Sequence, residues 1–60
     1  MRNVNKTDMV RTFDMDGNPV HVFQGCDWDQ AAMAPALKAE GAVKARIFNR
    51  SGELKGTHVL

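Results

Sequence analysis

The sequence has little of what small domains use to stabilise themselves covalently. Its one cysteine, Cys26, has no second cysteine to pair with, so no disulfide can form within the chain. A chain of 60 residues buries only about 60% of the surface that its unfolded form exposes. Small domains usually add disulfides, a structural metal or a partner subunit. The lack of a disulfide framework argues against a disulfide-rich secreted protein and favours a reducing, cytoplasmic setting.

Long apolar runs are also absent. No window approaches the roughly 20 apolar residues of a membrane span, and the opening MRNVNKTDMV has no apolar stretch of signal-peptide length. We therefore expect a soluble cytoplasmic protein that does not use a membrane. Because the chain begins with Met, we expect a complete small gene product.

Net charge is small but unevenly distributed. The total is +1, whereas residues 1–30 carry three bases and five acids and residues 31–60 carry five bases and two acids. Two halves of opposite charge that fold against each other explain this pattern. A basic second half that faces phosphate is the alternative.

The first four of the five glycines mark the places where the hydrophobic pattern changes, and they divide the chain into five segments. Apolar and β-branched residues, partly in alternation, predict strands at 9–15, 19–24, 42–48 and 54–60. The alanine-rich segment 27–40 predicts a helix. The order predicts an α+β fold, ββαββ, in which an antiparallel sheet of up to four strands packs on one helix. The domain is expected to span 9–60, with 1–8 as a flexible N-terminal arm.

The predicted helix has a signal at each end and a flaw in the middle. Asp27 is positioned to cap the first free amides, and Gly41 is a suitable left-handed stop after the last turn. Pro35 lacks an N–H group and crowds the preceding turn. We expect the helix either to kink at Pro35 or to divide there into two short turns.

A short motif near the start of the chain, Phe13-Asp14-Met15-Asp16-Gly17, resembles the opening motif of haloacid dehalogenase-like phosphohydrolases. The resemblance implies Asp14 as nucleophile and Asp16 as acid and base, and it covers about five residues. The stretch FNRSGE at 48–53 repeats the same pattern without a nucleophile. A three-residue hairpin loop with glycine at the left-handed position explains both copies, so we interpret both as turns.

If Met15–Gly17 form the first loop, the residues of the first hairpin divide between two faces. One face would hold Val10, Thr12, Val20 and Val22. The other would hold Met9, Arg11, Phe13, His21 and Phe23. Both faces carry apolar area, and one helix can cover only one of them, which favours a partner protein or a homodimer.

Protein-binding residues are therefore sought on the second of these faces and at the helix start. Tryptophan is enriched at interface hot spots, although for Trp28 the favoured interpretation is that it anchors the helix to the sheet. The candidate protein-binding residues are Met9, Arg11, Phe13, His21, Phe23 and Trp28.

The third predicted strand suggests a different partner. Lys44 and Arg46 alternate along it and can follow phosphates, while Phe48 can stack on a base and Arg50 follows in the next turn. A solvated strand face is the competing explanation. These four residues are the candidate nucleic-acid-binding set, and any such binding is expected to be weak and salt-sensitive.

Other chemistry has weaker support. His21, His58 and Cys26 lack the paired short spacings of zinc sites, and no cofactor motif is present. We therefore expect no metal, no cofactor and no enzymatic activity. The leading hypothesis is a non-catalytic protein-binding module, an inhibitor or adaptor of a larger protein, similar in size alone to the accessory proteins that phages use against their hosts. The alternatives are a nucleic-acid-binding protein that uses its basic strand and a small self-assembling structural subunit.

Overall fold

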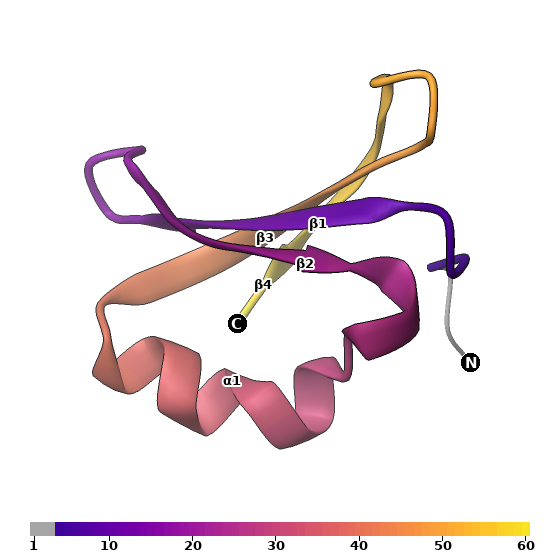
Figure 1. The fold of residues 1–60 in the computed structure, drawn as a ribbon. Helices are drawn as coiled ribbons and strands as arrows, with labels where there is room; N and C mark the ends of the chain where they lie inside the picture. The colour runs from indigo at the N-terminus through magenta and orange to yellow at the C-terminus, as the bar shows by residue number, and fades with distance from the viewer. Residues whose placement is uncertain (1–3) are drawn as a thin grey trace.

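The computed structural model describes residues 4–60 as a four-stranded sheet with one helix against it (Figure 1). The elements in chain order are β1 (Met9–Asp14), β2 (Pro19–Gln24), the 3-10 helix η1 (Gly25–Asp27), α1 (Gln30–Ala39), β3 (Ala42–Phe48) and β4 (Leu54–Val59). The predicted α+β class, with one α-helix and an antiparallel sheet, is confirmed. The expected ββαββ order did not include η1.

The sheet has the order β2-β1-β3-β4, and every neighbouring pair is antiparallel. The two hairpins therefore meet along β1 and β3, which become the central strands. β2 and β3 lie on either side of β1 in the sheet, and the segment from η1 through α1 connects them. In making this connection, α1 crosses one face of the sheet (Figure 1). No element of the described residues lies over the opposite face.

The core forms between the central strands and the helix. Val10 and Thr12 of β1 and Ala45 and Ile47 of β3 are almost fully buried, as strand alternation requires for one face. The helical segment adds Trp28 and Leu37, each 3% exposed, and few other buried side chains. Such a small core is what a chain of this length allows. Among the described residues, no helix is long and apolar enough to cross a bilayer.

The predicted faces of the first hairpin are wrong beyond its turn, because β2 contains a β-bulge. Phe13 faces Pro19 near the turn, but Arg11 faces Val22 and Val10 faces Phe23 further along. One extra β2 residue is thus accommodated opposite Thr12. The Thr12 hydroxyl accepts a hydrogen bond from the backbone N–H of His21 at 2.9 Å. This bond satisfies an amide at the irregularity and gives a polar side chain a role in the core.

The structure also corrects the start of the helix. Asp29, not Asp27, is the N-cap, and its carboxylate accepts a hydrogen bond from the Ala32 amide at 3.3 Å. Asp27 ends the short 3-10 helix instead. The α-helix is not divided, because Pro35 lies inside a single element. Gly41 follows it with φ of +95°, in agreement with the predicted left-handed stop.

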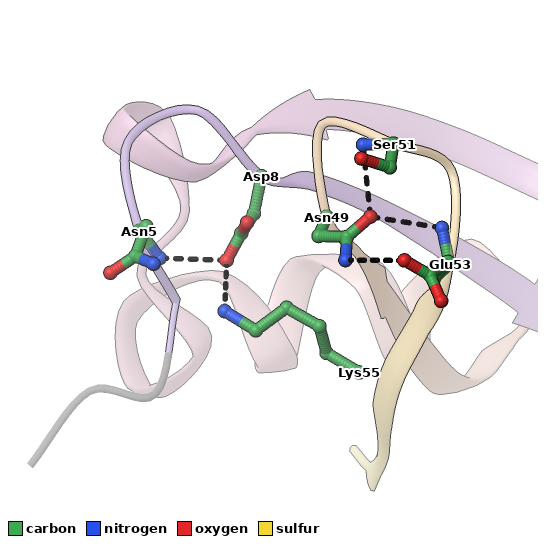
Figure 2. A network of polar contacts seen from close by, with 6 residues as sticks. All are labelled: Asn5, Asp8, Asn49, Ser51, Glu53 and Lys55. Carbon is green, nitrogen blue, oxygen red and sulfur yellow. Dashed lines mark hydrogen bonds and ion pairs between the residues drawn. The ribbon is translucent and has the colours of Figure 1, made fainter.

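Both hairpin loops have the predicted turn structure. Oδ1 of Asp14 accepts hydrogen bonds from the amides of Asp16 and Asn18, and Oδ1 of Asn49 accepts them from Ser51 and Glu53 (Figure 2 shows the second). Gly17 and Gly52 take positive φ values of 86° and 85°. A carboxylate and an amide thus have the same role in the two loops, which confirms that the DMDG motif forms a turn.

The residues before β1 are attached to the domain through Asp8. Its carboxylate accepts hydrogen bonds from the Asn5 amide at 2.8 Å and from Lys55 Nζ at 2.6 Å (Figure 2). Its carbonyl oxygen accepts a hydrogen bond from the Gly25 amide at 2.8 Å. These contacts join residues 5–8 to η1 and to β4. Flexibility of the arm 1–8 stays a prediction, and its first three residues lie outside the described part of the chain.

Candidate nucleic-acid interface

The uncovered face of the sheet carries the candidate site. Side chains on this face alternate with the buried ones, and α1 lies on the far side. They are exposed or half-buried because only their neighbours on the same face shield them. We call this surface the open face and define it by Met9, Arg11, Phe13, Val22, Gln24, Lys44, Arg46, Phe48 and Thr57.

Pairing of β1 with β3 sets the centre of the open face. Arg11 lies directly opposite Arg46. On one side of this pair Phe13 faces Lys44, and on the other side Met9 faces Phe48. Two residues opposite each other on antiparallel strands have Cβ atoms about 5 Å apart. The result is a pair of arginines with one aromatic side chain on each side along the strands.

Arg46 is held in place by an aromatic neighbour. Its guanidinium carbon lies 5.1 Å from the centre of the Phe13 ring, within the range of a cation–π interaction. The Nε atom of Arg46 is buried and has no hydrogen-bond partner among the described residues. Buried polar atoms normally have such a partner. The head group is therefore fixed while part of its capacity to donate hydrogen bonds is unused.

The acidic residues lie elsewhere. Within the four strands the only acid is Asp14, at the end of β1, and its carboxylate accepts the amides of the first turn. Of the other acids, Asp8 pairs with Lys55, and the rest belong to the hairpin turns, to η1 or to the two caps of α1. The open face therefore presents three cations, Arg11, Lys44 and Arg46, without an acidic side chain among its members. A low net charge hides this separation.

The structure divides the candidate protein-binding residues between the two faces of the sheet. Met9, Arg11 and Phe13 lie on the open face. The other three lie on the helix side, where the rings of His21 and Phe23 are 5.9 Å apart and those of Phe23 and Trp28 are 5.5 Å apart. Trp28 is buried, which agrees with the favoured interpretation that it anchors the helical segment to the sheet.

The candidate nucleic-acid-binding residues remain together, apart from Arg50. Lys44, Arg46 and Phe48 share the open face, whereas Arg50 is exposed in the loop between β3 and β4. Sequence reasoning did not place Arg11 and Phe13 beside this set. The only available signal was the alternation of basic and apolar residues in both segments, and it does not reveal that β1 pairs with β3.

A hollow lies on the helix side of the sheet, between β2 and α1. It measures about 360 Å³ and is lined mainly by apolar side chains, including Phe23, Met33 and Leu37. His21 Nε2 and Glu40 Oε2 lie 2.9 Å apart at its border, and both side chains are about half exposed. In the described residues no group of three His, Cys, Asp or Glu side chains is placed to hold a metal ion. This hollow therefore offers apolar surface and one exposed polar pair.

Comparison with known proteins gives no further guide to the site. No family model, curated protein or solved structure matches this chain. The groups on the open face are suited to binding. The guanidinium and ammonium groups can bind an anion, and the phenyl groups can stack on a flat ring.

Proposed function

We propose that this protein binds single-stranded nucleic acid on the open face of its sheet. The observation that carries the proposal is the pairing of Arg11 with Arg46 between two phenylalanines, on a face whose members include no acid. Single-stranded nucleic acid offers the complementary combination of phosphates and exposed bases, and four-stranded sheets with aromatic side chains are a recurring platform for it.

Charge also argues against the most obvious competing occupant. A second copy of this chain, stacked face to face, would bring two sets of Arg11, Lys44 and Arg46 together with no acid between them. Like charges at such distances repel, and burial would strengthen the repulsion. A polyanion removes this cost. Analytical ultracentrifugation tests the self-assembling alternative, because it separates a monomer from a defined oligomer.

An inhibitor or adaptor that binds a larger protein is the second proposal. It draws support from Met9 and Phe13, which are half-buried members of the open face, and from Val22, which is 48% exposed. A tagged pull-down with and without nuclease separates the two proposals. One stoichiometric protein that survives nuclease supports the inhibitor or adaptor. We further propose a cytoplasmic location, which the single cysteine favours.

The test of nucleic-acid binding is a salt titration of the affinity for a fluorescently labelled oligonucleotide, measured by anisotropy. Single strands of RNA and DNA and the matching duplexes are compared. If three phosphates are neutralised, the logarithm of the association constant should fall with the logarithm of salt concentration with a slope of about −2, since each phosphate contributes about 0.7 for single strands. We expect the duplexes to bind more weakly.

The decisive variant is the double substitution Arg11→Gln/Arg46→Gln. It should reduce the slope to about −0.7 and weaken binding at low salt. Lys6→Gln/Lys38→Gln is the matched control, because it removes the same charge from a turn and from α1, away from the open face. Equal losses in the two double variants would show that only net charge matters and would overturn the proposal.

A further inference from the structure

We infer that the Arg11–Arg46 pair is a phosphate subsite between two base platforms, Phe13 and Phe48, so that the ligand is a strand whose bases are splayed apart. This inference rests on the proposed function and specifies how the ligand lies. Three features of the open face support this inference: the position of the arginine pair, the stacking of the Arg46 head group on Phe13, and the distance between the two phenyl rings.

The arginine pair is unfavourable without a ligand. Arg11 and Arg46 are direct partners across β1 and β3, and like charges opposite each other destabilise a sheet. No acid of the four strands lies between them, since Asp14 is used by its turn. A phosphate between two guanidinium groups reverses the sign of this interaction, and guanidinium groups bind phosphate with directed, bidentate hydrogen bonds.

Arg46 is arranged as a donor before any ligand arrives. Stacking of its head group over Phe13 removes much of the rotational freedom that a free arginine would lose on binding. Its Nε–H is shielded from solvent and lacks a partner among the described residues. A phosphate oxygen at the open face could accept hydrogen bonds from this head group. Because Nε is shielded from solvent, the contact would use the terminal Nη groups of the guanidinium.

The two rings are too far apart for bases that are stacked on each other. Phe48 is opposite Met9, and Phe13 lies four residues further along β1. At about 3.4 Å per residue, the rings are separated by about 14 Å along the strands. Stacked neighbours in a nucleic-acid strand are only about 3.4 Å apart. Neighbouring nucleotides can therefore reach both platforms only if their bases are unstacked, and the arginine pair lies between the two platforms where it can bind the linking phosphate.

This arrangement also specifies the class of ligand. A duplex keeps its bases paired and stacked, so it cannot place one on each phenyl ring. A protein helix or an isolated phosphate could use the arginines but not both rings as stacking partners. Lys44 faces Phe13 across the strands and extends the positive surface beyond the central pair. A single strand that crosses β1 and β3 satisfies all of these groups, provided that its base stacks on the face of Phe13 that Arg46 does not cover.

The experiment compares two probes of equal length: nine-residue oligothymidylate and the same sugar-phosphate strand without bases. Phe13→Leu and Phe48→Met should each weaken binding of oligothymidylate by about 5- to 150-fold, the range expected from stacking of 1–3 kcal/mol per base. Phe48→Met should leave the affinity for the baseless strand unchanged. Phe13→Leu also releases the head group of Arg46, so it should weaken binding of both probes, and that of oligothymidylate more strongly. Arg11→Gln should weaken binding of both probes by the same factor.

Controls separate failure of this inference from failure of the proposed function. Met15→Ala changes an exposed residue of the loop between β1 and β2, outside the open face, and should bind both probes like the unmodified chain. Circular dichroism checks that each variant is folded. If the unmodified chain binds neither probe, the proposed function fails. If it binds both probes equally, or if Arg11→Gln matches a Lys6→Gln control, nucleic-acid binding stands and the splayed-base arrangement is overturned.

Discussion

The carboxylate of Asp8 and the ammonium group of Lys55 lie 2.6 Å apart, although 47 residues separate them in the sequence. The contact joins the segment before β1, the first strand in the sequence, to β4, the last strand (Figure 2). The hydrogen bond from Lys55 is the main cause that lowers the pKa of Asp8 below its ordinary value of 3.8, and the hydrogen bond from the Asn5 amide acts in the same direction.

A pH-dependent loss of stability follows for Asp8→Asn. Because the folded state favours the ionised carboxylate, Asp8 stabilises the fold above pH 3.8, and this contribution is lost as the pH falls through its lowered pKa. The free energy of unfolding of the variant should therefore be below that of the unmodified chain at pH 7, and the difference should shrink below pH 3.8. Urea unfolding at several pH values measures it. Asp16→Asn, in an exposed turn, is the control, and a gap that is constant with pH would contradict the role of the charge.

The bulge in β2 depends on one hydroxyl group. Thr12→Val keeps the shape of a fully buried side chain but leaves the amide of His21 without its acceptor. We expect a loss of about 1–3 kcal/mol in the free energy of unfolding, the cost of an unsatisfied buried group. Thr57→Val, at an exposed strand position, should change it by less than about 0.5 kcal/mol. Chemical denaturation measures the free energy of unfolding of both variants. Equal losses in the two would show that the Thr12 hydroxyl does not stabilise the bulge.

Gly25 is required by a close approach of two backbone segments. A methyl group there would overlap the carbonyl oxygen of Asn5, so Gly25→Ala must displace the turn that Asp8 holds. We expect it to lower the free energy of unfolding by about 1–3 kcal/mol. Gly56→Ala is the matched control, since nothing lies within 4 Å of its added carbon. Thermal unfolding of the pair checks the prediction, and a neutral Gly25→Ala would show that the turn can move freely.

The DMDG turn makes a prediction about Asp14 that does not depend on its charge. Asp14→Asn preserves the oxygen that accepts two backbone amides, as Asn49 does in the other loop. It should be nearly neutral, whereas Asp14→Ala should cost about 0.5–1.5 kcal/mol in the free energy of unfolding. Denaturant titration of both variants measures this. Equal destabilisation by Asn and Ala would mean that the charge itself is needed.

Local features of the fold were predictable because short-range chemistry determines them. Two six-residue stretches with an Asx residue and a glycine at fixed positions specified both hairpin loops. Strand alternation and alanine content located the strands and the helix. The helix start was displaced by two residues because Asp27 and Asp29 are both good caps and only tertiary packing of Trp28 distinguishes them.

Features that depend on pairing between distant segments were not predictable from the sequence. The bulge opposite Thr12 changes the face on which Val22 and Phe23 lie, and no local signal marks it. Pairing of β1 with β3 placed Arg11 beside Arg46 and thereby joined parts of two residue sets that had been assigned to different partners. The site thus emerges from the strand order rather than from any one motif.

The cations of the open face are separated from the acids of η1, of the two caps of α1 and of the turns, which gives the molecule a dipolar charge distribution. A net charge of +1 predicts almost no attraction to an anionic surface, but a dipole turns its positive side toward that surface before contact. The protein should therefore be retained on a cation-exchange resin longer than its isoelectric point of about 8.0 suggests. A larger share of encounters with a polyanion would lead to binding than for randomly oriented collisions, because the open face is turned toward the polyanion before contact.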